Sequence, residues 1–322
     1  MNIFADSTNF IFPVFVYDDE TIYRNSLHLK YLNDSKVFIK DIPDFIQGLM
    51  DFSINNILVF GVPAKRNSLG TAAFEKKGVT QRSIKKIKEL FGKKINVISD
   101  VCVCQYNLSG HCGIYTHNYK KNKNNQSNLN RNKLDNDETL KILGKITLSL
   151  AESGTDFIAP SSMMDGQVFY LKRILKDNNY DTVKIMSYSS KHNSCLYSPF
   201  RNNNFYQSVS IDKSYYQNSY HNLHESLREV TLDINEGADW VMIKPSFWYM
   251  DIIKALKSFI KKPLVVQNVS GEYALIKSAS VNNWIDGNEW AILSLLSLKR
   301  AGADKIISYF IVSLLKKYYE NK

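Results

Sequence analysis

The sequence lacks the features that mark membrane-spanning, secreted and disulfide-stabilised proteins. Its 322 residues include only 4 cysteines, and no apolar run reaches the roughly 18 residues that a membrane-spanning helix needs. The first residues, Met-Asn-Ile-Phe-Ala-Asp, contain no basic region followed by a long apolar region, so we expect no secretory signal. These absences predict a cytoplasmic protein with no membrane partner, in which the cysteines stay reduced.

Acidic residues are few relative to basic ones, with 31 against 41 and a net charge of +10. Such a balance is typical of nucleic-acid binders, but residues 118–134 alone hold five basic and no acidic residues, which leaves +5 for the rest of the chain. This stretch is polar and low in complexity. We therefore predict an inserted loop at 116–135 and no nucleic-acid partner; the alternative rests on the net charge alone.

No Gly-x-Gly-x-x-Gly turn follows an early strand, which argues against an open, doubly wound sheet. Instead, eight short apolar stretches alternate with helical patterns, which favours a (β/α)8 or TIM barrel with its active site at the C-terminal ends of the strands. We expect a short N-terminal arm over 1–10 and one barrel domain over 11–322. The expected strands are 11–16, 57–60, 95–101, 156–160, 183–188, 241–244, 264–269 and 305–310, and the clearest expected helices are 43–52, 80–91, 223–234, 252–259 and 288–300.

A repeated tripeptide marks three of the helix-to-strand connections. Gly154-Thr-Asp, Gly237-Ala-Asp and Gly302-Ala-Asp each follow a helical pattern and precede an apolar strand. Glycine at a helix C-terminus tolerates the left-handed conformation that ends the helix. The three repeats therefore predict αβ turns of one kind.

Lys244 ends an apolar strand, because Pro245 directly after it cannot donate a hydrogen bond to a neighbouring strand. An ammonium there is poorly solvated, which favours the neutral amine that attacks carbonyl groups. The alternative is a lysine that reaches solvent or pairs with a carboxylate. A second reactive group aimed at the same place would favour the catalytic interpretation.

Other chemically active residues also fall at predicted strand ends and would share one barrel mouth with Lys244. Lys191 follows its strand in the same way, and two lysines that lower each other's pKa suggest two imines. Cys102, Cys104 and Cys112 lie within eleven residues, and three reduced thiolates on one loop suit zinc with a fourth position open. The other residues expected at this barrel mouth are Asp100, Ser161, Asp165, Ser270 and Tyr309. We expect Cys195 to be a buried core residue and His111 to be a neighbour of the metal ligands.

Several motifs resemble one family over most of the chain, from about residue 54 to 311. They are Asp-Val-Cys-Val-Cys-Gln-Tyr with Gly-His-Cys-Gly (100–113), Asn-Asp-Glu-Thr-Leu (136–140), Ala-Pro-Ser-Ser-Met-Met-Asp-Gly (159–166), Ser-Tyr-Ser-Ser-Lys (187–191), Ser-Pro-Phe-Arg (198–201), Glu-Gly-Ala-Asp-Trp-Val-Met-Ile-Lys-Pro (236–245) and Val-Ser-Gly-Glu-Tyr-Ala (269–274). Together they are similar to delta-aminolevulinic acid dehydratase, or porphobilinogen synthase. The resemblance implies a TIM-barrel lyase that condenses two 5-aminolevulinate molecules to porphobilinogen in tetrapyrrole (haem) biosynthesis.

The resemblance also implies roles for individual residues. Lys244 would form the imine with the substrate that binds first, Lys191 the imine with the second, and Asp100 would assist proton transfer. The cysteines match the zinc-dependent branch of the family, and Glu229 matches a magnesium position that some members use for allostery, the alternative being a solvated helix glutamate. The substrate carboxylates would be held by Ser270 and Tyr309 for the first molecule and, on a lid over 192–220, by Arg201, Lys213 and Gln217 for the second.

The sequence departs from the family pattern at a few positions. Lys213 stands where arginine is usual and cannot reproduce a bidentate grip on a carboxylate. Gln267 replaces a usual tyrosine, Ser109 replaces a usual histidine, and the basic N-terminal arm that supports the family's homo-octamer is mostly missing. We predict an active zinc enzyme, with a non-catalytic relic that serves assembly or binding as the alternative.

Overall fold

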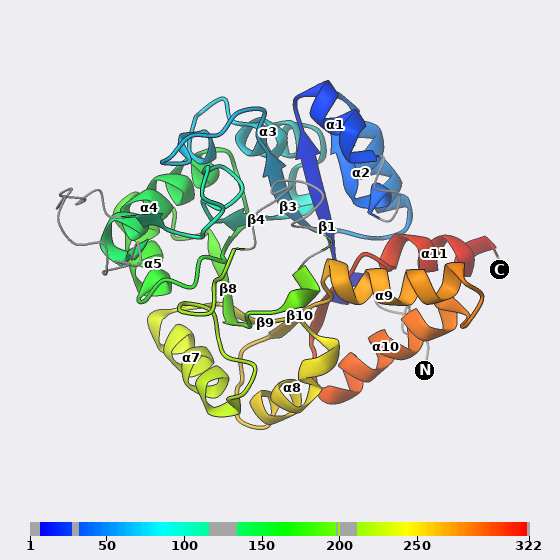
Figure 1. Cartoon of the computed structure of the whole chain (residues 1–322). Coiled ribbons are helices and arrows are strands. Elements are labelled where there is room, and N and C mark those ends of the chain that lie inside the picture. Colours follow the sequence, from blue (N-terminus) through cyan, green and yellow to red (C-terminus); the bar gives the residue numbers. More distant parts are fainter. Residues whose placement is uncertain (1–6, 28–31, 116–133, 198, 200–210, 321–322) are drawn as a thin grey trace, which may run out of the picture.

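Eight parallel strands close into a barrel, as the sequence predicts (Figure 1). The computed structural model describes residues 7–27, 32–115, 134–197, 199 and 211–320. The last strand pairs with the first, Phe10 lying opposite Ile306, and this pairing closes the barrel. In chain order the barrel strands are β1 (Phe10–Tyr17), β3 (Asn56–Val62), β4 (Asn96–Val101), β7 (Phe157–Pro160), β8 (Lys184–Lys191), β9 (Trp240–Lys244), β10 (Leu264–Gln267) and β11 (Lys305–Ile307).

Helices surround the barrel, and their apolar faces pack against the outer faces of the strands. The predicted helices are confirmed as α2 (Ile42–Asp51), α3 (Val79–Phe91), α7 (Leu223–Glu236), α8 (Met250–Lys257) and α10 (Gly287–Ala301), and the pattern that ends near Gly154 is α4 (Asn136–Glu152). The structure adds elements for which the sequence analysis gave no prediction: α1 (Glu20–Leu27), β2 (Lys36–Phe38), α5 (Gln167–Asp177), α9 (Ser270–Val281) and α11 (Ile311–Glu320).

Four strand predictions were wrong by two or more residues at one end. β3 continues through Gly61 to Val62 rather than ending at Phe60. β8 continues to Lys191 rather than ending at Tyr188. β10 ends at Gln267 and β11 at Ile307, because the residues that follow turn into α9 and α11 instead of continuing the ladder. β1 already begins at Phe10, so the predicted arm keeps at most nine residues, of which 7–9 form a short 3-10 helix.

The three glycine tripeptides form links of the same kind between helix and strand. Gly302 adopts a φ of 126°, and the aspartate two residues later accepts a hydrogen bond from the first amide of the neighbouring strand, with Leu264 N at 2.8 Å from Asp304 Oδ2. A lysine from the helix that precedes the neighbouring strand, here α8 before β10, lies against the glycine and completes the link, with Lys257 Nζ at 2.6 Å from the same oxygen. Asp156 with Lys88 and Asp239 with Lys172 repeat this arrangement.

One strand of the barrel contains an extra residue. Along β8 and β9 the register is Ser187 with Val241, but then Ser190 with Ile243, so three steps on β8 match two steps on β9. A bulge of this kind changes which side of the sheet the following residues face. The outward position of Ser190 is confirmed by its hydrogen bond to Ser226 on α7, and Lys191 next to it faces the barrel interior beside Lys244.

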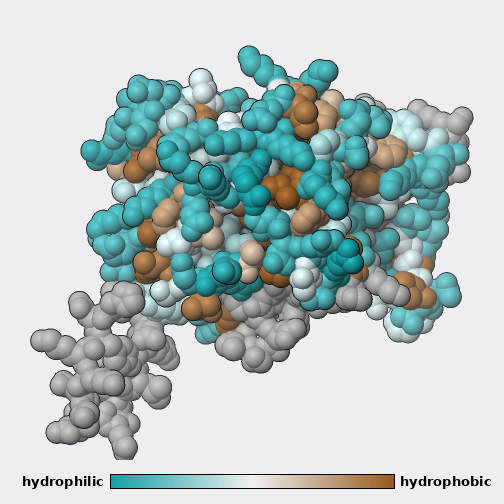
Figure 2. Space-filling model, turned by 90° about the horizontal axis from the view of Figure 1, so that it is seen from above, coloured by the Kyte–Doolittle hydropathy of each residue, from teal (hydrophilic) through white to brown (hydrophobic). Residues whose placement is uncertain are grey.

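The inserted segment leaves and rejoins the barrel at one point. β5 (Ile114–Tyr115) pairs antiparallel with β6 (Leu134–Asp135), so the last two residues of the predicted loop are a short strand, and the remainder, 116–133, lies outside the described residues. The face seen in Figure 2 is mainly hydrophilic, with hydrophobic residues in separate small patches. Among the described residues, no helix is long and apolar enough to cross a membrane.

Candidate active site

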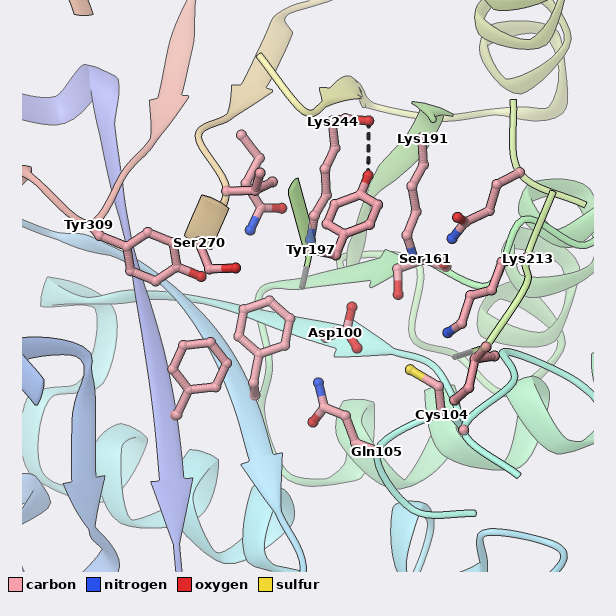
Figure 3. Close-up of a pocket in the computed structure, with 17 residues that line it drawn as sticks. Asp100, Cys104, Gln105, Ser161, Lys191, Tyr197, Lys213, Lys244, Ser270 and Tyr309 are labelled. Carbon is pink, nitrogen blue, oxygen red and sulfur yellow. Dashed lines mark hydrogen bonds between the residues drawn. The ribbon is translucent and has the colours of Figure 1, made fainter. Parts of the chain in front are cut away.

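A cavity opens at the C-terminal ends of the barrel strands, where the sequence places the active site. Its empty volume is about 810 Å³, which includes open solvent at the mouth. Figure 3 shows Lys191 and Lys244 side by side, with Ser270 and Tyr309 toward one end and Cys104 and Lys213 toward the other. The predicted site residues that line the cavity are Asp100, Cys104, Ser161, Lys191, Lys213, Gln217, Lys244, Ser270 and Tyr309.

The two lysines lie at the same level on adjacent strands, because Lys191 pairs with Lys244 in the β8–β9 ladder. Their ammonium groups share one aromatic ring: Lys244 Nζ lies 5.2 Å and Lys191 Nζ 5.5 Å from the centroid of Tyr188. A ring face attracts cations, by about 0.5–2 kcal/mol when the pair is desolvated. Tyr188 therefore provides a common support under both amines.

Desolvation, followed by the like charge of Lys191, lowers the pKa of Lys244 to about 7. Asp100 lies across the cavity from the lysines (Figure 3), and its buried Oδ1 has no hydrogen-bond partner within the described residues. Desolvation raises the pKa of Asp100 to about 6, although Lys191 and a hydrogen bond from Ser161 oppose the rise. An amine and a carboxyl that both titrate near neutral pH can attack a carbonyl and exchange protons.

The backbone ties the two lysine-bearing strands together beyond the ladder. The carbonyl oxygen of Lys244 accepts hydrogen bonds from the backbone N–H of His192 at 2.9 Å and from the hydroxyl of Tyr197 at 3.3 Å (Figure 3). The same hydroxyl donates to the carbonyl of His192 at 2.9 Å. The Lys191 side chain is also held, since its Nζ donates to the carbonyl oxygen of Ser161 at 2.5 Å.

The three cysteines gather into one cluster beside the cavity. The sulfur atoms of Cys102, Cys104 and Cys112 all lie within 4.8 Å of one another, which is compatible with three ligands of one tetrahedral metal ion. Hydrogen bonds from the Cys102 and Cys104 thiols lower the pKa of Cys112, and the Nζ of Lys213 donates to its Sγ at 3.3 Å. A thiolate-bearing group of three soft donors fits zinc.

The opposite end of the cavity is built around the start of α9. Ser270 is the first residue of this helix, where the backbone amides and the helix dipole favour an anion. Glu272, one turn in, accepts hydrogen bonds from the backbone N–H groups of Ser246 at 2.9 Å, Phe247 at 2.5 Å and Val269 at 2.6 Å. This buried carboxylate therefore fixes α9 to the segment that follows Lys244.

The described part of the predicted lid covers the cavity from the side of the cysteines. Lys213 and Gln217 are 6% and 3% exposed, and both line the cavity. Asn218 anchors this segment to the end of β8, since its side chain accepts from the Lys191 N–H at 3.1 Å and its own N–H donates back at 3.0 Å. Arg201 lies outside the described residues.

Four other residues singled out in the sequence do not line this cavity, and two of them are placed differently from the prediction. Glu229 lies on α7 and lines a second cavity with several acidic residues, and desolvation raises its pKa. Asp165 also belongs to that second cavity, so its predicted place in the barrel mouth was wrong, because the loop after β7 turns outward before α5. Cys195 is exposed on a short 3-10 helix rather than buried in the core. His111 contacts Tyr216, its Nδ1 lying 3.4 Å from that hydroxyl.

Sequence reasoning missed Tyr188, Tyr197, His192 and Glu272 as parts of the site. Tyr188 and Tyr197 look like ordinary buried aromatic residues, and nothing in their spacing separates a ring under an ammonium from one in the core. Glu272 carried a signal that was overlooked, since a glutamate three residues after the start of an otherwise apolar segment is typical of helix N-termini.

A TIM barrel with two lysine amines side by side at its mouth has the architecture of a lyase that activates carbonyl substrates. The chain is a member of the delta-aminolevulinic acid dehydratase family, whose sequence profile matches residues 4–317. It is 42% identical over 307 residues to the delta-aminolevulinic acid dehydratase of Methanothermus sociabilis, covering 95% of this chain and 90% of that one. It is 36% identical over 302 residues to that of Bacillus subtilis, covering 94% and 88%.

A solved structure agrees with this assignment over nearly the whole chain. The delta-aminolevulinic acid dehydratase (porphobilinogen synthase) of Toxoplasma gondii ME49, in complex with the reaction product porphobilinogen, superposes with a TM-score of 0.87. The two sequences are 28% identical, and the match covers 99% of this chain and 87% of that one.

Proposed function

We propose that this chain condenses two molecules of 5-aminolevulinate to porphobilinogen with loss of two waters, as a step of tetrapyrrole biosynthesis. The observation that carries the proposal is the level pairing of Lys191 and Lys244 at one barrel mouth, over the shared ring of Tyr188. An aldolase activates one carbonyl compound through one imine, whereas two adjacent amines can each form an imine with one of two ketones. Family membership supports the same reaction.

In the proposed mechanism each lysine activates one substrate. The neutral amine of Lys244 attacks the C4 ketone of the first molecule, and loss of water from the adduct leaves an iminium ion; Lys191 does the same with the second. Lys244 reaches the neutral state readily because its pKa is lowered to about 7. Asp100, with a pKa near 6, takes up and returns protons between the two substrates.

The two substrate carboxylates are held at opposite ends of the cavity. Ser270 and Tyr309 bind the carboxylate of the first molecule at the N-terminus of α9. Lys213 and Gln217, together with Arg201, bind that of the second molecule on the side of the cysteines. Lysine provides one point charge in place of a forked guanidinium, so we expect a raised KM for the second substrate.

The cysteine cluster is the proposed zinc site. Cys102, Cys104 and Cys112 would hold the ion, and zinc when bound supplies a Lewis acid for the amino end of the second substrate. Glu229 is the proposed magnesium position, which would act from the second cavity. By resemblance we further propose a single catalytic domain over 11–322 that assembles as a homo-octamer in the cytoplasm; light scattering on the purified protein tests the assembly.

The decisive experiment is a porphobilinogen assay on the zinc-loaded protein, with and without a chelator. We expect product that disappears on chelation and returns with added zinc. Borohydride reduction with 5-aminolevulinate should give a covalent adduct on Lys244, and Lys184→Ala, at the opposite end of β8, serves as the control that keeps the adduct. A folded Lys244→Ala protein that still makes porphobilinogen would refute the imine assignment.

A further inference from the structure

Gln267 is a buried polar residue of the cavity wall that has no role in the proposed mechanism. It is the last residue of β10, is 1% exposed and lines the cavity. Its Oε1 has no hydrogen-bond partner within the described residues. A buried amide without a partner costs folding free energy, so its presence needs an explanation.

The strand register fixes where the Gln267 side chain points. Val265 and Val266 pair with Met242 and Ile243 on β9, which sets Gln267 level with Lys244. Residues level with each other on adjacent parallel strands face the same side, so Gln267 faces the barrel interior. On its other side it pairs with Ile307 of β11, two residues before Tyr309. Gln267 therefore lies between the imine lysine and the end of the cavity formed by Ser270 and Tyr309.

That end of the cavity offers an anion only neutral groups. Among the described residues that line it there are aromatic and aliphatic side chains, the hydroxyls of Ser270 and Tyr309, and the Gln267 amide, while the charged lining residues come from β4, β8, β9 and the cysteine and lid segments. A carboxylate has about four lone-pair sites and binds best to several donors. Two hydroxyls leave room for a further donor.

We propose that the Gln267 amide is the third ligand of the first substrate's carboxylate, donating an N–H beside Ser270 and Tyr309. The inference rests on the proposed function. In it, Gln267 helps to select substrates whose carboxylate lies at a fixed distance from the ketone carbon that Lys244 attacks. The Oε1 position has no donor facing it within the described residues, and a half-turn of the amide exchanges its oxygen and NH2 ends, so the side chain can turn its N–H groups toward the carboxylate.

Two measurements separate this role from a structural one. The first is the melting temperature without ligand; the second is the 5-aminolevulinate concentration that gives half-maximal borohydride trapping on Lys244. In Gln267→Leu and Gln267→Met we expect an equal or higher melting temperature, because an unpartnered polar group is removed, and a half-trapping concentration raised roughly tenfold. Two variants are used so that a packing defect specific to one does not decide the result.

Gln81 provides a matched control. It is also a glutamine that is 1% exposed with an unpartnered Oε1, but it lies on α3 and its Nε2 donates to the carbonyl of Ala73 and the hydroxyl of Ser149, both at 2.9 Å. Gln81→Leu should lower the melting temperature and leave the half-trapping concentration unchanged. The two glutamines should thus respond in opposite ways.

A second pair of probes tests the carboxylate itself. The wild type should trap 4-oxopentanoate at lower concentration than its neutral amide, 4-oxopentanamide, and Gln267→Leu should reduce this preference by about the factor lost for 5-aminolevulinate. A lower melting temperature with an unchanged half-trapping concentration overturns the inference alone, as does an unchanged preference for the carboxylate. Absence of any trapping in the wild type overturns the proposed function and this inference together.

Discussion

The lowered pKa of Lys244 leads to a prediction in which two neighbouring charges act with opposite sign. An ordinary lysine with a pKa near 10.5 is only about 0.03% neutral at pH 7, whereas a pKa of about 7 makes roughly half of the amine neutral, an increase of about 1,500-fold. Desolvation is the main cause, the charge of Lys191 lowers the pKa further, and Asp100 raises it. Trapping on Lys244 should therefore rise as pH increases through about 7.

The signs follow from which neighbour is removed. In Lys191→Met a like charge is lost, so the pKa of Lys244 rises and the trapping midpoint moves to higher pH. In Asp100→Asn an opposite charge is lost, and the midpoint moves to lower pH. The assay is cyanoborohydride trapping of 5-aminolevulinate from pH 5 to 9, with the modified lysine identified by mass spectrometry. Midpoints that shift in the same direction in both variants would refute the electrostatic reasoning.

Three further predictions concern residues that support the site. Tyr188→Phe should stay active, because the ring under both lysines remains and the lost hydroxyl has no partner within the described residues. Tyr188→Leu removes the ring and should lower kcat/KM about 5- to 30-fold. Equal losses of kcat/KM in both variants would exclude a role for the ring contact. Glu272→Gln should lower the free energy of unfolding by about 2–3 kcal/mol in urea titrations, since the buried N–H of Val269 loses its acceptor. The control Glu89→Gln, at an exposed position, should leave the free energy of unfolding unchanged. Gly302→Ala should lower the free energy of unfolding by about 1–3 kcal/mol, because the new methyl group meets Lys257 Cγ at 2.6 Å. The control Gly48→Ala, at an open helical position, should raise it slightly. An unchanged free energy of unfolding in Gly302→Ala would contradict the described link geometry.

The barrel was predictable because each strand is a short apolar run bounded by turn residues. Lys244 could be placed from sequence since Pro245 ends its strand in any fold, and the cysteines could be grouped since they share one loop. The glycine tripeptides predicted where helices turn into strands. They did not predict that each aspartate would bind the neighbouring strand and a helix lysine, because those partners are distant in the chain.

Contacts across the barrel were beyond reach of the sequence. The length of β8 was underestimated since serines at 187, 189 and 190 weaken the apolar pattern, although their hydroxyls are satisfied by α7 and the strand itself. β2 is only three residues long and begins with a lysine, so no periodicity exposes it. The unpartnered amide of Gln267 can be recognised only once every neighbouring side chain is in place.

The bulge in β8 decides how many reactive amines the barrel mouth contains. If β8 kept all its residues but had no bulge, the alternation of inward and outward side chains would carry Ser190 into the interior and turn the amine of Lys191 toward the helices. A deletion of Ser189 removes only the residue that the bulge absorbs, so the barrel should keep both imine lysines, with Lys191 still level with Lys244. Whether the barrel can activate one carbonyl compound or two therefore depends on a local irregularity of one strand, which absorbs a residue and keeps the second amine on the inner face.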